Sequence, residues 1–175
     1  MKADVERALA PLAGLPLWGP ARQSNMLSLQ FGGREAPNGM PNEAAGAYGL
    51  YVFCAWRLTR GDALLAGSAD LFTPADPDED LDTFDYEAPG ATWWDARWRA
   101  YADAAASAPP TVASIAADAF GGLRLALSDG AALEVFPNSA PAEHVETEFW
   151  RLVRPGRAGP PFVVGTAGAA HADDA

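Results

Sequence analysis

The sequence predicts an α+β protein that is mostly antiparallel β, with a two-sheet, sandwich-like core. Three observations lead to this prediction. Several short segments alternate apolar and polar residues with the period of a β-strand. Asp129-Gly130, between two such segments, is the strongest hairpin signal in the chain. The segment 92–106 instead repeats its large apolar residues with the period of a helix.

The length of 175 residues suits one globular domain, which we place at 1–165. Hydrophobic residues make up 49% of the chain and charged residues 20%, close to the averages for globular proteins. Residues 166–175 are small and polar and show no apolar periodicity. We therefore expect them to form a disordered tail.

The first β unit covers residues 24–70 and follows a short predicted helix over 2–10. Alternation of Leu and Phe over 25–31 predicts its first strand. The run 47–59 alternates for longer, and both of its faces are largely apolar. This pattern predicts a central strand that is covered on both sides. A turn then leads to a short predicted strand over 63–66.

An acidic loop and a helix occupy residues 71–108, between the two β units. Thr92 is predicted to cap the helix, and Asp95 completes a capping box. Asp95 and Arg99 are four residues apart and are expected to pair on the outer face. The inner stripe of the helix consists of Trp94, Trp98, Tyr101 and Ala105.

The second β unit covers residues 111–165. Its predicted strands are 123–127, 131–137, 149–153 and 161–164, while the Ala-rich run 111–119 is ambiguous.

The two units repeat motifs in the same order. Trp56-Arg57-Leu58 in the first corresponds to Trp150-Arg151-Leu152 in the second. One interpretation is an internal duplication, with two β-meanders packed face to face. The other is chance similarity between strands rich in Leu and Val.

The paired Trp-Arg-Leu strands, together with Ala66-Gly67-Ser68 and Leu133–Phe136, carry a resemblance to known proteins. From Leu27 to Val164 the chain resembles a group of small uncharacterised bacterial proteins of actinobacterial type. Its size, charge and β content are also broadly similar to those of toxin-immunity proteins. The resemblance implies no assigned activity, so it transfers no catalytic residue.

The charge balance excludes one class of partner. The chain has 12 Lys and Arg against 23 Asp and Glu, a net charge of −11. Proteins that bind the phosphates of nucleic acids need a surplus of Lys and Arg, so we expect no nucleic-acid partner. The negative charge is concentrated, because residues 71–105 hold nine acids and two arginines. Such a surface speeds association with a basic partner.

Several features that the sequence lacks bear on the cellular compartment and on catalysis. A lone cysteine, Cys54, excludes an internal disulfide and is expected to be a buried core residue in a cytoplasmic protein. No apolar run is long enough for a membrane helix, and the interrupted N-terminal segment predicts no signal peptide. The two histidines, His144 and His171, form no evident nucleophile–base arrangement. We therefore expect a non-enzymatic protein without a cofactor.

Two clusters of acidic and histidine side chains could in principle bind a metal ion. Asp76, Asp78, Asp80, Asp82 and Glu87 fall at positions 1, 3, 5, 7 and 12 of a calcium-loop count. Leu81, however, stands where the sharp turn of such a loop needs Gly, so a solvated acidic loop is favoured. The group Glu143, His144, Glu146 and Glu148 is likewise favoured as a solvated loop. The prediction is therefore no metal site.

Two hypotheses for the function remain. The first is an acidic binding protein, in sharper form an immunity protein that neutralises a basic toxin such as a nuclease. Its predicted contact residues are Asp78, Asp80, Asp82, Phe84, Asp85, Tyr86 and Glu87. The second is a small-molecule-binding or enzymatic β domain with an aromatic pocket between the sheets. Its predicted lining residues are Tyr51, Trp56, Arg57, Trp150 and Arg151. The six tryptophans also leave open an oligomer subunit.

Overall fold

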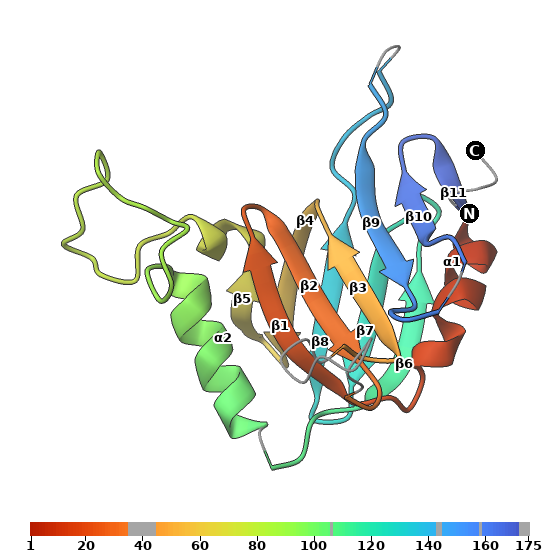
Figure 1. Cartoon of the computed structure of the whole chain (residues 1–175), viewed down its shortest axis with the longest axis horizontal. Coiled ribbons are helices and arrows are strands. Elements are labelled where there is room, and N and C mark those ends of the chain that lie inside the picture. Colours follow the sequence, from red (N-terminus) through yellow and green to blue (C-terminus); the bar gives the residue numbers. More distant parts are fainter. Residues whose placement is uncertain (35–44, 106, 143–144, 158, 172–175) are drawn as a thin grey trace.

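Two antiparallel sheets lie face to face in the structure, a computed structural model that describes residues 1–34, 45–105, 107–142, 145–157 and 159–171 (Figure 1). The first sheet has the strand order β1-β2-β3-β9-β10-β11, and the second has the order β5-β4-β8-β7-β6. This architecture confirms the predicted α+β class and the two-sheet core.

The first sheet contains β1 (Leu17–Gln23), β2 (Met26–Phe31), β3 (Tyr48–Val52), β9 (Glu148–Val153), β10 (Phe162–Gly165) and β11 (Gly168–His171). The second contains β4 (Ala55–Arg60), β5 (Ala63–Gly67), β6 (Val112–Ala117), β7 (Leu123–Leu127) and β8 (Ala131–Phe136). The helices are α1 (Lys2–Leu9), α2 (Trp93–Ala104) and the short 3₁₀ segments η1 (Ala10–Leu12) and η3 (Ser68–Leu71).

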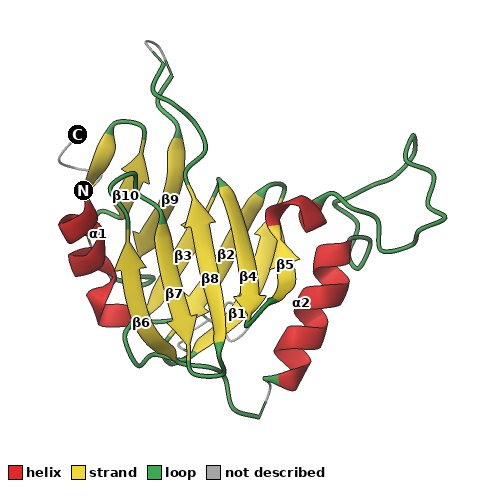
Figure 2. Cartoon of the chain, turned by 180° about the vertical axis from the view of Figure 1, so that it is seen from behind, coloured by secondary structure: helices red, strands yellow, loops and turns green. Residues whose placement is uncertain are grey.

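The two α-helices cover opposite ends of the sandwich (Figures 1 and 2). α1 packs on β6, and its Glu6 accepts a hydrogen bond from the backbone N–H of Ala117 at 3.2 Å. α2 packs on β5 and η3, and its Arg97 donates to the carbonyls of Leu64 and Leu65 at 3.4 Å. Each helix therefore satisfies polar backbone groups on an edge strand of the second sheet.

The core lies between the sheets and under the helices. The inward face of α2 is the predicted one, since Trp94 and Trp98 are buried and stack at 6.1 Å. The capping box between Thr92 and Asp95 is also confirmed. The largest fully buried side chain is that of Trp150, whose Nε1 donates to the carbonyl of Gly121 at 2.8 Å.

The two β units correspond strand by strand. β1, β2, β3, β4 and β5 match β6, β7, β8, β9 and β10. Exchanging each strand for its counterpart converts the order β1-β2-β3-β9-β10 of the first sheet into the order β6-β7-β8-β4-β5 of the second, and β11 lies outside this correspondence. The register repeats as well, as these matched pairs show: Leu27↔Val52, Leu29↔Leu50 and Trp150↔Val52 in one sheet, Leu123↔Val135, Leu125↔Leu133 and Trp56↔Val135 in the other. This pseudo-two-fold relation supports the duplication.

The packing of the units differs from the prediction, because each unit contributes strands to both sheets instead of forming one sheet. The run 47–59, predicted as one central strand, is divided between β3 and β4, which belong to different sheets. Its inward residues stay buried on both sides of the crossing. Its other face is only partly covered, since Tyr51 and Phe53 are half-buried and Arg57 is exposed. The prediction of cover on both faces therefore holds only in part.

Three further segments depart from the sequence-based expectations. β1 was not predicted, because Gly19 and Pro20 interrupt its apolar pattern. The ambiguous run 111–119 contains β6. The expected disordered tail includes β11, which pairs with β10 through its backbone and needs no apolar pattern. Residues 172–175 lie outside the described residues. In the described part of the chain, no helix has the length and apolar character needed to span a membrane.

Candidate functional site

A long loop projects from the α2 end of the sandwich, between η3 and α2 (Figure 1). It contains the acidic segment 76–87, which we call the acidic loop. All seven of its carboxylate residues are exposed: Asp76, Asp78, Glu79, Asp80, Asp82, Asp85 and Glu87. No Lys or Arg side chain of the described residues forms an ion pair with any of them. Their charge therefore faces solvent.

Local turns give the acidic loop its shape. The carboxylates of Asp76, Asp80 and Asp85 each accept a hydrogen bond from the backbone N–H two residues later, at 2.9 to 3.0 Å. These are Asx turns, which Asp favours because its short side chain reaches its own backbone. These three turns shape the loop through hydrogen bonds within the loop itself.

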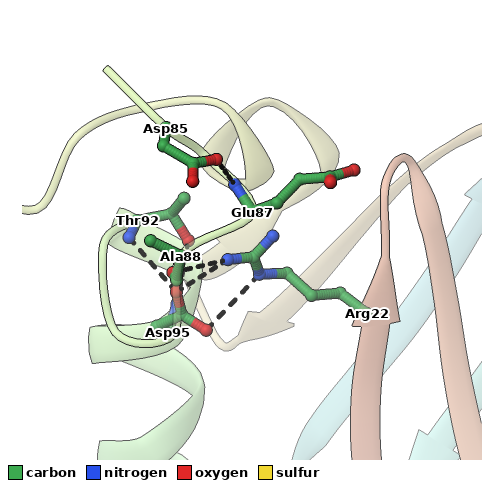
Figure 3. Close-up of polar contacts among 6 residues, drawn as sticks. All are labelled: Arg22, Asp85, Glu87, Ala88, Thr92 and Asp95. Atoms are coloured by element: carbon green, nitrogen blue, oxygen red, sulfur yellow. Dashed lines mark hydrogen bonds and ion pairs between the residues drawn. The ribbon is translucent and has the colours of Figure 1, made fainter. Parts of the chain in front are cut away.

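A buried arginine holds the base of the loop (Figure 3). Arg22 of β1 forms an ion pair with Asp95 of α2 at 3.1 Å, with only 8% and 13% of the two side chains exposed. The same guanidinium donates to the carbonyl of Ala88 at 3.3 Å. Ser24 adds a hydrogen bond to Glu87 at 2.9 Å. The hairpin β1–β2 thus fixes the end of the loop where it enters α2.

Asp95 is the most connected carboxylate at this base. It accepts hydrogen bonds from the backbone N–H and the hydroxyl of Thr92 at 3.2 and 3.0 Å. Burial alone would raise the pKa of Asp95, but the hydrogen bonds from Arg22 and Thr92 outweigh it and lower that pKa below its ordinary value. The expected pairing with Arg99 is replaced by the pair with Arg22. Sequence spacing carries no signal for that contact, because 73 positions separate the two residues.

The predicted contact residues all lie on this loop, but they differ in what they offer. The carboxylates are exposed, while Phe84 is half-buried. Tyr86 is 36% exposed and packs edge-on against Phe72, with the ring centroids 5.1 Å apart. Phe72 and Trp93, both partly exposed beside the loop, were not among the predicted contact residues.

The geometry does not assemble a metal site from the described residues, since no three His, Cys, Asp or Glu side chains lie close enough to hold an ion. Of the second cluster weighed above, Glu143 and His144 lie outside the described residues. Glu148 forms a two-point ion pair with Arg151 at 2.6 and 2.8 Å.

The residues expected to line a pocket between the sheets do not share one surface. Trp56 and Trp150 are packed in the core, 2% and 0% exposed. Tyr51, Arg57 and Arg151 lie on the outer faces, as the alternation of strand side chains requires. Arg57 pairs with Glu134 at 2.7 Å, which agrees with a structural role.

A different cavity, of about 100 Å³, lies between β1 and the C-terminal half of α2. Its rings come from Trp18, Trp98 and Tyr101, and Arg34 stacks over Trp18 at 4.7 Å. Trp98 is almost fully buried, yet its Nε1–H has no acceptor in the described chain. The buried Nε1–H groups of Trp56 and Trp94 also have no acceptor in the described chain, so this property does not single out the cavity.

The other perturbed groups have structural roles. Cys54 is buried, and this burial raises the pKa of its thiol to about 12, so the thiol stays protonated. Tyr101 donates to Asp129 at 3.1 Å, and Arg60 pairs with the same carboxylate. Burial is the first cause that raises the pKa of Tyr101, followed by the charge of Asp129. This triad ties α2 to the β7–β8 hairpin.

Comparisons of this chain with protein-family models, with curated proteins and with solved structures found no significant match.

Proposed function

We propose that this protein is a non-enzymatic, cytoplasmic binding protein that recognises a basic protein through the acidic loop. The observation that supports this function best is the ordered projection of seven exposed carboxylates without a cationic partner in the described chain. Unpaired charges of one sign create a local field that steers an oppositely charged partner and favours its capture. The buried Arg22–Asp95 pair already holds the base of the acidic loop in place, so the loop loses less conformational entropy when it binds a partner.

In its sharper form, the proposed function is that of an immunity protein for a basic bacterial toxin such as a nuclease. A nuclease needs a cationic groove for phosphates. An acidic loop can occupy such a groove with carboxylates at the positions that phosphates would take. Residues 76–87 supply seven of them within twelve positions and carry no Lys or Arg.

The test uses a variant that removes charge without disturbing the loop. Asp78, Glu79 and Asp82 accept no side-chain hydrogen bond that the structure shows, unlike the Asx-turn residues. The variant Asp78→Asn/Glu79→Gln/Asp82→Asn therefore lowers the negative charge by three and keeps the turns. A matched control, Asp62→Asn/Asp103→Asn/Glu146→Gln, removes the same charge from exposed acids elsewhere.

Each protein is immobilised and exposed to a bacterial lysate at low salt, and bound proteins are identified by mass spectrometry. We expect wild type and control to retain the same basic protein in stoichiometric amount and to release it as salt rises. The loop variant should bind that protein about tenfold more weakly. Equal binding by the loop variant and wild type would contradict the assigned site.

The cavity beside Trp98 favours a second candidate, the binding of a small molecule. Its volume suits a single small ring, and the side chains of Trp18, Trp98 and Tyr101 offer that ring apolar contacts. A thermal-shift screen of small cyclic metabolites tests this candidate. A saturable rise in melting temperature that Trp98→Phe abolishes would support it. A rise that survives in Trp98→Phe would locate the ligand elsewhere.

A further inference from the structure

Large exposed apolar side chains gather at the α2 end of the sandwich. Among the described residues, nine large apolar side chains are exposed, and five of them come from the segment 64–93. These five are Leu64 (57% exposed), Phe72 (46%), Leu81 (73%), Tyr86 (36%) and Trp93 (41%). Single exposed apolar residues are ordinary, whereas a contiguous group marks an interaction surface.

One ring contact, one backbone hydrogen bond and one shared arginine place four of these residues near one another. The rings of Phe72 and Tyr86 touch edge to face at 5.1 Å. The backbone N–H of Trp93 donates to the carbonyl of Thr73 at 2.8 Å, which brings Trp93 next to the chain at Phe72. We call this group the apolar patch, and its members are Leu64, Phe72, Tyr86 and Trp93.

One arginine completes the link to β5. The guanidinium of Arg97 lies 4.8 Å from the centroid of the Trp93 ring. The same group donates to the backbone carbonyl of Leu64. The guanidinium of Arg97 therefore contacts the apolar patch and the edge of β5, and it forms no ion pair with a carboxylate of the acidic loop.

The backbone beneath the patch is held in place. Residues 74 and 92 form an antiparallel bridge, and the N–H of Ala75 donates to the carbonyl of Ala91 at 2.8 Å. Asp70 caps η3 by accepting from the N–H of Gly67 at 2.9 Å. A surface that is already ordered loses little conformational entropy on binding.

The charge around the patch indicates what can cover it. Residues 72–93 contain seven acids and no Lys or Arg. A second copy of the chain, with the same loop and a net charge of −11, would be repelled there. A segment in which Lys or Arg flanks a large apolar side chain fits both features, because its cations face the loop and its apolar group contacts the patch.

We infer that the apolar patch buries a Trp, Phe or Leu side chain of the basic partner, and that this side chain is flanked by Lys or Arg. This inference rests on the proposed function, since the acidic loop supplies the attraction. It adds that charge alone is insufficient, and that a partner is selected by an apolar side chain within its basic segment.

The test compares two synthetic peptides of equal length and equal lysine content. One carries tryptophans between the lysines, and the other carries serines at those positions. The variant is Trp93→Ala, and the matched control is Phe136→Ala on the outer face of the second sheet. Phe136 has the same 41% exposure as Trp93, and Arg57 stacks on it at 4.9 Å as Arg97 stacks on Trp93 at 4.8 Å. Leu64→Ser serves as a second variant, because Leu64 is the most exposed member and its loss does not touch the base of the loop.

Peptide affinities are measured by fluorescence anisotropy at low salt. We expect the tryptophan peptide to bind wild type about five- to tenfold more tightly than the serine peptide, and Trp93→Ala and Leu64→Ser to remove that advantage. Phe136→Ala should keep it. Equal affinity of the two peptides for wild type, or an equal loss in Phe136→Ala, would overturn the role of the patch.

The same peptides test the role of the acidic loop separately from the role of the apolar patch. If the charge variant Asp78→Asn/Glu79→Gln/Asp82→Asn binds both peptides as wild type does, the acidic loop is not the attracting surface. If the tryptophan advantage persists in that variant, the patch acts without the loop. A dimer in light scattering that dissociates in Trp93→Ala would assign the patch to a second copy and overturn the partner proposed here.

Discussion

The buried ion pair between Arg22 and Asp95 should be the most sensitive point of the loop's base. We consider Asp95→Asn, which keeps the shape of the side chain and removes its charge. The amide oxygen can still accept the hydrogen bond from the backbone N–H of Thr92 that completes the capping box, so the change acts mainly on the charge. It leaves the guanidinium of Arg22, with 8% of its side chain exposed, without an anion.

The magnitude follows from that burial. Breaking a buried pair by removing one partner costs about 3–5 kcal/mol, because the other charge stays uncompensated. Since Asp95 is 13% exposed and the new amide oxygen can accept one bond from Arg22, we expect the lower end, about 3 kcal/mol. In a chain of this length, that corresponds to a fall of about 6–12 °C in melting temperature.

The stabilisation by the Arg22–Asp95 pair should also depend on pH. The pKa of Asp95 is lowered by folding, so its stabilisation is fully present above the unfolded-state pKa of about 4. It is lost as the pH falls through the lower folded-state pKa. The difference in unfolding free energy between wild type and Asp95→Asn should therefore shrink between neutral pH and about pH 3.

Urea denaturation at both pH values measures this difference, and Glu134→Gln is the control. Glu134 pairs with Arg57 and Arg124, whose side chains are 51% and 53% exposed, and each such pair contributes about 0–1 kcal/mol. If Asp95→Asn cost no more than Glu134→Gln at neutral pH, or cost the same at both pH values, the assigned electrostatic role of the pair would be refuted.

Three further predictions concern the core. Gly121→Ala should destabilise the fold far more than Gly130→Ala. Both glycines have positive φ, but of the two only Gly121 would place its new Cβ against another atom, 2.6 Å from Val164 Cγ1. Thermal melts of the two variants measure the difference. Trp150→Phe should cost about 2–4 kcal/mol in urea denaturation, through lost volume and a lost hydrogen bond to Gly121. The thiol of Cys54, with a pKa of about 12, should react with a maleimide at mildly alkaline pH only after unfolding; reaction in the native state would contradict its burial.

The repeated Trp-Arg-Leu motif illustrates what local patterns reveal. In both copies the Trp is buried and the Arg lies on the outer face, as strand alternation requires. The prediction held because side-chain direction along a strand is a property of the backbone. The assignment of both copies to one pocket required the two strands to be placed in space, and they lie in different sheets.

The sequence by itself determined the properties that arise within one element or one turn. These are the capping box at Thr92, the inward stripe of α2, the Asp129-Gly130 hairpin and the concentration of acids in 76–87. Each depends on residues a few positions apart, where spacing fixes geometry.

Only the tertiary structure decided which distant segments meet. It divided the run 47–59 between two sheets, because a strand can bend at Phe53-Cys54 and keep its inward residues buried on both sides. It also paired Asp95 with Arg22 instead of Arg99, because the fold brings the Arg22 guanidinium of β1 to within 3.1 Å of the carboxylate. The apolar patch beside the acidic loop likewise forms from residues on β5, at the end of η3, on the loop and on α2 that the packing of α2 brings together.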